Sequence, residues 1–347
     1  MKRAVVIGGA GFVGRRLVEM LAGEAAHPGW PTFDAVHVLD VAELRPLSGT
    51  RVPVTSERGD IRSRQTLKGA LEGAHTVFHT ASLVDVGLRP NPAIDAVNVE
   101  GTRNVVEVAA ALGVPFLIYT SSEDVALSET PVRGADETLS YPSRPIHDYV
   151  RTKIEGERIA LGADGTNGMR TLSIRPVHVY GPGDPHAIIT SLKAFGKGTV
   201  PFLLGDGSAR FDVVYVDNVV HAHLLGAAKL ADPQAASRVA GRAYIANEDN
   251  APNYFDFLRP YAAAKGVTMP RFHLGRRRTR ALAQMMAWTH RLTGLDVPFH
   301  PFHSYVICED FFFSSDRAKN ELGYAPLVAP AEGQARTVRW LEGVSLD

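Results

Sequence analysis

Short apolar runs rich in β-branched residues alternate with longer stretches of helical periodicity through the first half of the chain. In the stretch 12–21, for example, Leu17, Val18 and Leu21 fall on one face of a helix. Strands separated by helices of this length require right-handed crossovers, which build a parallel sheet. The pattern predicts strands at 4–7, 35–39, 76–79, 115–120 and 171–175, and helices at 12–21, 66–71, 94–112 and 147–161.

The pattern changes after Pro176. Loops rich in Gly and Pro precede a predicted strand at 211–216 and a helix at 217–230, and from about residue 250 we expect only helices and loops. We therefore expect an α/β fold with a doubly wound parallel sheet and a smaller C-terminal substrate-binding part. The sheet would comprise residues 1–180 with returning segments at about 211–248, and the smaller part 181–210 and 249–347.

A glycine-rich loop joins the first predicted strand to the first predicted helix. Gly8, Gly11 and Gly14 are spaced for a tight turn, a close approach of the backbone to a pyrophosphate, and close packing of helix on strand. The amides at the start of the helix, near Phe12 and Val13, would face the phosphates. The loop predicts a Rossmann-type dinucleotide site.

Acidic residues near the ends of two further strands suit the remainder of a dinucleotide. Asp40 ends the second strand, where a carboxylate binds ribose hydroxyls and repels a 2′-phosphate. An insertion at 23–34 lengthens the route from the glycines to Asp40. Asp60, followed by Ile61, is placed to accept from the adenine amino group, with a turn or a helix N-cap as its alternative role. The sequence favours NAD over NADP.

A tyrosine and a lysine four residues apart share one face of the helix predicted at 147–161. They are Tyr149 and Lys153, and Ser121 and Ser122 follow a predicted strand upstream. An ammonium beside a phenol lowers the phenol's pKa from about 10. Such a phenol suits general acid/base catalysis of an alcohol–ketone interconversion.

Composition excludes several classes of protein. Lys and Arg total 37, as do Asp and Glu, so no global field favours nucleic acid. The single cysteine, Cys308, excludes an internal disulfide. The N-terminal apolar run is shorter than a signal segment, and no uncharged run approaches the roughly 18 residues of a membrane span. We expect a cytoplasmic protein.

One segment suggests contact with a membrane surface. Four arginines at 276–280 precede an apolar, helix-like stretch at 281–288. Such a segment can rest on a membrane or cover an apolar pocket. The alternative is a helix with one solvated and one buried face. The sequence thus allows a peripheral membrane location through about 276–290.

Together these motifs resemble the extended short-chain dehydrogenase/reductase superfamily. Further matches are HTAS at 79–82, IRPVHVYGPGD at 174–184, VDNV at 216–219 and KNELGYAP at 319–326. Within it, NVEGTRN at 98–104, YTSSEDV at 119–125 and GRAYIANE at 241–248 are most similar to the 3β-hydroxysteroid dehydrogenase branch, which includes decarboxylating sterol-4α-carboxylate 3-dehydrogenases.

The resemblance implies a role for each matching residue. Ser122 would polarise the substrate oxygen, Tyr149 would be the acid/base, and Lys153 its partner. Asn98 would support Lys153 through water. The cofactor would also be lined by Ala81, Pro176 and Val177.

The implied activity is NAD-dependent interconversion of a secondary alcohol and a ketone on a 3β-hydroxysteroid or sterol, with decarboxylation where a carboxyl lies beside the new ketone. The resemblance also implies a homodimer. Trp288 and the three phenylalanines at 311–313 suit a large apolar substrate or ordinary core packing.

Three other functions remain open. A nucleotide-sugar epimerase or dehydratase would use the same residues, and Glu123-Asp124 supplies the acidic pair that dehydratases favour. Against it, the region 180–211 offers few basic residues for a diphosphate. The others are a long-chain β-keto acid reductase and a non-catalytic NAD-sensing or scaffold protein.

Overall fold

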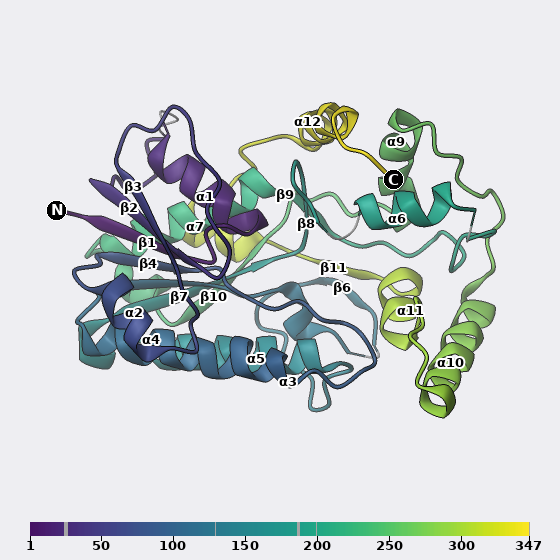
Figure 1. Ribbon diagram of the computed structural model, residues 1–347, viewed down its shortest axis with the longest axis horizontal. Coiled ribbons are helices and arrows are strands. Elements are labelled where there is room, and N and C mark those ends of the chain that lie inside the picture. The colour runs from purple at the N-terminus through teal and green to yellow at the C-terminus, as the bar shows by residue number, and fades with distance from the viewer. Residues whose placement is uncertain (24–26, 129, 186–187, 199, 347) are drawn as a thin grey trace.

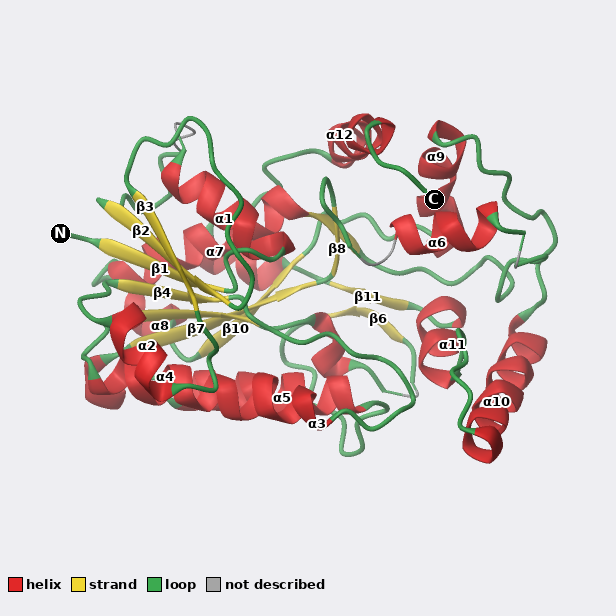
Figure 2. Ribbon diagram, viewed as in Figure 1, coloured by secondary structure: helices red, strands yellow, loops and turns green. Residues whose placement is uncertain are grey.

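A seven-stranded parallel sheet with helices on both faces forms one half of the molecule (Figures 1 and 2). The computed structural model describes residues 1–23, 27–128, 130–185, 188–198 and 200–346. The strand order is β10-β7-β5-β4-β1-β2-β3. This confirms the predicted α/β fold with a doubly wound sheet. The strands are β1 Arg3–Ile7, β2 Ala35–Asp40, β3 Val54–Arg58, β4 Thr76–His79, β5 Phe116–Thr120, β7 Arg170–Pro176 and β10 Arg242–Ala246.

Alternating side chains of β1 build two cores, one on each face of the sheet. Ala4 and Val6 pack with α1 (Phe12–Ala22) and α7 (Val216–Ala231). Val5 and Ile7 point to the opposite face, as the two-residue period of a strand requires. That face is covered by α2 (Arg64–Leu71), α4 (Thr102–Ala111) and α5 (Asp148–Gly162).

The strand order reverses beside β1. Ile7, its last residue, lies between Leu39 of β2 and His79 of β4. The connections therefore leave β1 in opposite directions, and a crevice opens at the carboxyl ends of these strands. Ligands of open parallel sheets bind at this position.

The helix predicted at 94–112 is present but is not a uniform α-helix. It begins as α3 (Pro92–Asp95), passes through a π-helical turn at Ala96–Gly101, and continues as α4. Asn98 lies in the π turn and is buried. Turns of this kind often mark functional positions.

The insertion at 23–34 docks on the first core, although residues 24–26 lie outside the described residues. Trp30 packs against that core and donates its indole N–H to Nδ1 of His221, on α7, at 2.8 Å. The insertion thus lengthens the chain between α1 and β2 without displacing Asp40 from the end of β2.

The rest of the chain builds a second assembly beyond the carboxyl ends of the strands (Figure 1). Leu192, Leu258 and Leu341 belong to its core. The elements of this assembly are η2 Glu123–Ala126, β6 Val132–Ala135, β8 His178–Tyr180, α6 Ile188–Gly196, β9 Val213–Tyr215, α9 Tyr254–Ala264, α10 Arg276–Thr293, α11 Pro301–Cys308, β11 Phe311–Phe313 and α12 Pro330–Glu342. Three short elements pack on the sheet half instead: η3 Thr166–Gly168, α8 Ala236–Val239 and η4 Ala318–Leu322. The proposed division into 1–180 with 211–248, and 181–210 with 249–347, stays a prediction.

Two sequence-based expectations for this region are wrong. The strand predicted at 211–216 is only Val213–Tyr215, because α7 already begins at Val216. A strand, β11, also occurs after residue 250, where only helices and loops were expected. It pairs in parallel with β6, a long-range partner that a local pattern does not reveal. None of the helices in the described ranges has the length and hydropathy to span a bilayer.

Candidate active site

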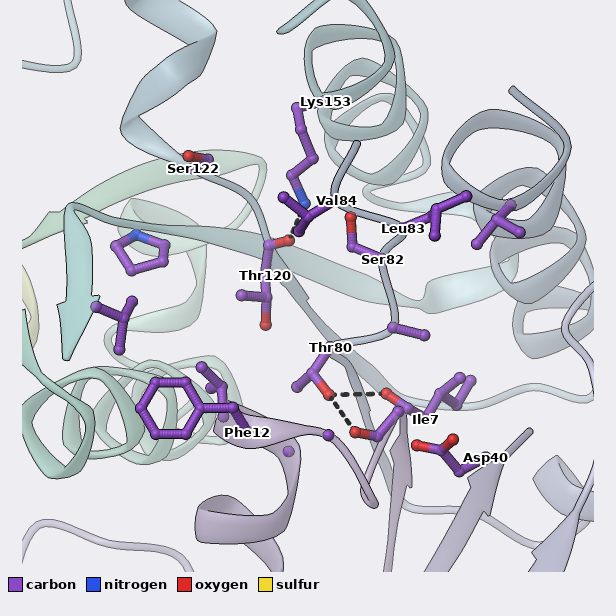
Figure 3. A pocket seen from close by; sticks show the side chains of 18 of the residues that line it. Ile7, Phe12, Asp40, Thr80, Ser82, Leu83, Val84, Thr120, Ser122 and Lys153 are labelled. Atoms are coloured by element: carbon purple, nitrogen blue, oxygen red, sulfur yellow. Dashed lines mark hydrogen bonds between the residues drawn. The ribbon is translucent and has the colours of Figure 1, made fainter. Parts of the chain in front are cut away.

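A cavity of about 650 Å³ occupies the crevice at the carboxyl ends of β1, β2, β4, β5 and β7 (Figure 3). Its wall combines the glycine loop, the residues after β5 and one face of α5. All but one of the residues predicted for the site line this cavity. They are Gly8, Gly11, Phe12, Val13, Gly14, Asp40, Asp60, Ile61, Ala81, Ser122, Tyr149, Lys153, Pro176 and Val177.

The glycine loop brings α1 and β1 closer than any side chain allows. Gly8 has φ +86°, and a β-carbon there would lie 2.6 Å from the amide nitrogen of Ala81. A β-carbon on Gly14 would lie 2.1 Å from the carbonyl oxygen of Gly8. Gly11, the N-cap of α1, gives the helix no side-chain cap, so its first amides remain available to an anion. The loop fits a dinucleotide pyrophosphate.

Thr80 holds this loop in place from β4. Its hydroxyl lies 2.9 Å from the carbonyl oxygen of Ile7 and 3.3 Å from that of Gly8, and both contacts are drawn in Figure 3. The sequence reasoning did not select Thr80 individually. Its position beside Ala81 at the end of a buried strand was the available signal.

Asp40 binds the glycine loop as well as facing the cavity. Oδ2 accepts from the amide of Ala10 at 2.9 Å, and Oδ1 accepts from the amide of Ala42 at 2.8 Å. Hydrogen bonds from two backbone amides fix the carboxylate at the edge where a ribose would lie. The same residue therefore shapes the loop and presents negative charge.

Asp60 is neither a helix N-cap nor without a partner. It pairs with Arg62 at 2.6 Å, and this guanidinium lowers the pKa of the Asp60 carboxyl. The N-cap of α2 is Ser63 instead. Asp60 remains an ionised acceptor on the cavity wall.

Ser122, Tyr149 and Lys153 meet at the opposite end of the cavity from Asp40. Ser122 is the N-cap of the short helix η2, and its hydroxyl accepts from the amide of Asp124 at 3.2 Å. The Lys153 ammonium donates a hydrogen bond to the carbonyl oxygen of Thr120 at 2.8 Å, as Figure 3 shows. The neighbouring Ser121 also lines the cavity, but its buried hydroxyl makes no hydrogen bond within the described part of the chain.

The electrostatics of Tyr149 differ from the expectation based on spacing alone. Burial and the carboxyls of Asp124 and Glu123 raise the pKa of the phenol well above its usual value. Burial lowers the pKa of Lys153 to about 8. The spacing predicted an ammonium that lowers the pKa of Tyr149, but in the structure desolvation and the two carboxyls dominate.

Asn98 is the one predicted residue outside the cavity wall. Its Oδ1 accepts from the amide of Leu83 at 2.7 Å, and its Nδ2 donates to the carbonyl oxygen of Leu83 at 2.9 Å and to Thr152 Oγ1 at 3.2 Å. These side-chain bonds connect the loop after β4 with α5. Asn98 thus contacts the cavity through Leu83, which lines it.

The aromatic residues suggested for an apolar substrate lie elsewhere. Phe311 and Phe313 belong to a buried core with Val150 and Val177. Trp288 projects from α10 and is 57% exposed. None of the three lines the cavity. Phe311 and Phe313 pack in a core, and Trp288 lies on the surface, so none of them is needed to line the cavity.

Comparison with known proteins decides the family. The model of the 3-beta hydroxysteroid dehydrogenase/isomerase family matches residues 5–275. The chain belongs to this family. The resemblance identified from the motifs is therefore confirmed, and with it the assignment to oxidoreductases that act on secondary alcohols.

Two curated relatives cover nearly the whole chain. The decarboxylating sterol-4-alpha-carboxylate 3-dehydrogenase of Homo sapiens is 33% identical over 97% of this chain and 88% of its own. The 3 beta-hydroxysteroid dehydrogenase/Delta 5→4-isomerase of Mycobacterium tuberculosis is 32% identical over 94% of this chain and 86% of its own.

Solved structures with the same fold include enzymes of nucleotide sugars. The dTDP-glucose 4,6-dehydratase of Streptomyces venezuelae has a TM-score of 0.74 and 23% identity, covering 98% of this chain and 97% of its own. The UDP-glucose 4-epimerase of Thermus thermophilus, in complex with NAD, has a TM-score of 0.70 and 24% identity, covering 99% and 100%. At this identity the likeness establishes the fold.

Proposed function

We propose that the chain is an NAD-dependent 3β-hydroxysteroid dehydrogenase that oxidises a secondary alcohol of a sterol-like substrate to the ketone. One observation carries the proposal. Ser122, Tyr149 and Lys153 open onto the same cavity as the glycine loop of Gly8 and Gly14. A hydride acceptor and an alcohol can therefore meet within one cavity.

The cavity offers a set of contacts for each part of NAD. The amides at the start of α1 would bind the pyrophosphate, Asp40 the adenosine ribose and Asp60 the adenine amino group. Pro176 and Val177 would flank the nicotinamide. When bound, oxidised nicotinamide supplies an acceptor for the hydride of the carbinol carbon.

The side chains then divide the proton chemistry. Ser122 holds the substrate oxygen, and Tyr149, once ionised, removes the hydroxyl proton as the C–H bond breaks. Lys153 lies one helical turn from Tyr149 and can donate to a ribose while its charge favours the phenolate.

The names of the relatives narrow the substrate class. One relative is a decarboxylating sterol-4-alpha-carboxylate 3-dehydrogenase and another acts as a Delta 5→4-isomerase. When a carboxyl lies beside the new ketone, the product is a β-keto acid. It loses CO₂ when the bond to the carboxyl carbon breaks and the electron pair of that bond forms the C=C bond of an enol. Leu83, Val84 and Val179 give the cavity an apolar wall that suits a sterol.

The cavity gives less support to a nucleotide-sugar substrate. Among the described residues that line it, Lys153 is the sole lysine or arginine. The basic residues of the region 180–211 that a diphosphate would need are Lys193, Lys197 and Arg210, and none of them lies on the cavity wall. A sugar nucleotide would add a second diphosphate with no cationic partner there.

NADH formation on a matched panel tests the proposal. The panel contains 3β-hydroxysterols, 4-carboxysterols and UDP-sugars, each with NAD and separately with NADP. We expect turnover of a sterol with NAD, and loss of turnover with retained NAD affinity in Tyr149→Phe. Turnover of UDP-sugars alone, or an active Tyr149→Phe variant, would overturn it.

We also propose a homodimer formed through α4 and α5. These helices lie side by side on one face of the sheet (Figure 2). The resemblance to the superfamily supports this pairing across a two-fold axis. Light scattering during size exclusion should give twice the chain mass of 37.5 kDa, and a monomer at working concentration would contradict it.

The outer face of α10 supports a peripheral contact with an anionic lipid surface. Thr279, Ala283 and Ala287 are buried, so the helix packs by one face. The opposite face and its flanks expose large apolar side chains and arginines. They are Phe272, Met285, Trp288, Leu292 and Leu295, with Arg271, Arg277, Arg278 and Arg291 among them. Apolar anchors among cations suit a headgroup layer.

Contacts of Arg89 connect α10 to the loop beside the cavity, so the membrane contact would lie close to the entrance for the substrate. The Arg89 guanidinium donates to the carbonyl oxygen of Gly294 at 3.0 Å and pairs with Asp296 at 2.7 Å. Arg89 follows the loop of Leu83 and Val84, which lines the cavity. A substrate dissolved in the membrane would then enter the cavity directly next to the bilayer.

Flotation with vesicles of phosphatidylcholine, with and without phosphatidylglycerol, tests the contact. We expect binding to the anionic vesicles that weakens at least about tenfold in the Trp288→Ser/Leu292→Ser variant. Leu327→Ser, which changes an exposed leucine outside α10 and outside α4 and α5, is the matched control. Equal binding by both variants would contradict the proposal.

A further inference from the structure

The hydroxyl of Ser122 stands among three acidic groups at one end of the cavity. Its Oγ lies 3.2 Å from Oε2 of Glu123 and 3.1 Å from Oδ2 of Asp124. It also accepts from the Asp124 amide at 3.2 Å. Glu123, Asp124 and Tyr149 all line the cavity with it.

These contacts are incompatible with two ionised carboxylates. A serine hydroxyl has one hydrogen to donate and two lone pairs, and the Asp124 amide occupies one lone pair. The single hydrogen can serve one carboxylate at a time. The other carboxyl bonds Oγ only if it carries a hydrogen of its own. Two negative charges around one buried hydroxyl also repel each other.

The surrounding charges decide which carboxyl holds the proton. Burial raises the pKa of both carboxyls, but the Ser122 hydroxyl, Lys153 and His147 favour the anion of Asp124. Glu123 instead faces the carboxyls of Asp124 and Asp212. Burial and Asp124 raise the pKa of Glu123 well above its ordinary value. The pair therefore places its negative charge on Asp124.

We propose that Glu123 is a positioning residue that keeps a proton in the working enzyme and donates it to Ser122, so that one negative charge rather than two lies beside Tyr149. The proposal rests on the proposed function, in which Ser122 and Tyr149 act on the substrate. Because Glu123 occupies a lone pair of Oγ, the serine hydrogen remains available to Asp124 or to the substrate oxygen.

The proton on Glu123 matters for the chemistry of Tyr149. Both carboxyls, together with Tyr119 of β5, oppose ionisation of the phenol. A neutral Glu123 removes one of these charges and brings the phenolate within reach. Loss of the Glu123 proton at high pH would restore the second negative charge and break the hydrogen bond from Glu123 to Ser122. The rate should therefore fall on the alkaline side.

The pH profile of kcat/KM tests this dependence. In the wild type we expect an alkaline limb that falls up to about tenfold per pH unit. Glu123→Gln cannot ionise, so its limb should lose the contribution of Glu123 and keep only that of Lys153, whose pKa is about 8. Asp124→Asn removes the charge that faces Glu123, so its limb should move to lower pH. Glu72→Gln, an exposed carboxyl far from the cavity wall, should keep the wild-type profile.

Infrared difference spectroscopy reads the proton without turnover. At neutral pH the wild type minus Glu123→Gln difference should contain the C=O stretch of a protonated carboxyl, and the wild type minus Glu72→Gln difference should not. Absence of that band, or an alkaline limb in Glu123→Gln that is identical to the wild-type limb, would overturn the proposal. An active Tyr149→Phe variant would overturn the proposed function while leaving the infrared result intact.

Discussion

The Arg175 guanidinium binds both carboxylate oxygens of Glu157 in the interior of the protein, at 2.8–3.1 Å. Glu157 is 0% exposed and lies one helical turn from Lys153 on α5. Ser173 and Tyr141 donate to the same carboxylate at 2.7 and 2.8 Å. This network fastens the helix that carries Tyr149 to strand β7.

Removal of one partner should therefore destabilise the fold. Arg175→Met leaves Glu157 charged and unpaired in the interior, which costs about 3–5 kcal/mol. The double variant Glu157→Gln/Arg175→Met removes both charges and should recover a large part of that loss. Urea unfolding measures both, and the exposed pair Arg259–Asp256 provides a control, since Arg259→Met should cost less than about 1 kcal/mol. Equal losses at the two arginines would contradict the role of burial.

Burial of Lys153 predicts a stability that rises with pH. Its pKa is lowered from 10.5 to about 8, so between these values the folded protein holds fewer protons than the unfolded chain. The destabilisation is complete below pH 8, about 3–4 kcal/mol at 1.4 kcal/mol per pH unit, and is relieved as the pH rises through this window. Lys153→Met has no such group to titrate.

Unfolding curves of both proteins across that window provide the measurement. The difference in unfolding free energy between wild type and Lys153→Met should move in favour of the wild type as the pH rises. Lys68→Met, at an exposed position of α2, should instead run parallel to the wild type. Parallel curves for Lys153→Met would show that the ammonium is solvated in the folded state.

The close approach in the glycine loop predicts a sharp contrast between two glycines. In Gly14→Ala the new β-carbon would lie 2.1 Å from a backbone oxygen, so α1 must move away from β1. We expect NAD affinity to fall at least about tenfold as the pyrophosphate cradle opens. Gly69 lies within helix α2 with nothing within 4 Å of a new β-carbon, so Gly69→Ala should keep the affinity and stabilise the protein by about 0.5–1 kcal/mol. Calorimetric titration with NAD distinguishes the two.

Local patterns were sufficient for five of the seven strands of the sheet, while the bounds of β3 and β10 were not predicted. Each predicted strand there lies within about a residue of its observed bounds, because hydrophobic runs flanked by glycine or polar residues are local signals. Strand β11 was missed because its pairing partner, β6, lies far away in sequence. The π turn around Asn98 was missed for a related reason. It depends on tertiary bonds to Leu83 and Thr152 rather than on residue spacing.

The candidate site shows the same limit. Motifs selected residues that the structure gathers around one cavity, since each motif sits at a strand end or a helix start. The direction of the Tyr149 pKa shift was not accessible from the four-residue spacing to Lys153. It depends on burial and on where the Glu123 and Asp124 carboxyls fold back, and these are properties of the assembled cavity.

The bonds of Asn98 predict a positioning role that can be separated from catalysis. Asn98→Ala leaves both backbone polar groups of Leu83 without their partner, which should cost about 1–3 kcal/mol each when buried. The loop of Leu83 and Ser82 lines the cavity, so its loosening should raise KM for substrate and NAD more than it lowers kcat. Steady-state kinetics at several temperatures would show the KM effect growing as the loop melts, and the exposed Asn320→Ala should show neither change. A fall in kcat alone, with KM and stability unchanged, would instead place Asn98 in the proton transfer itself.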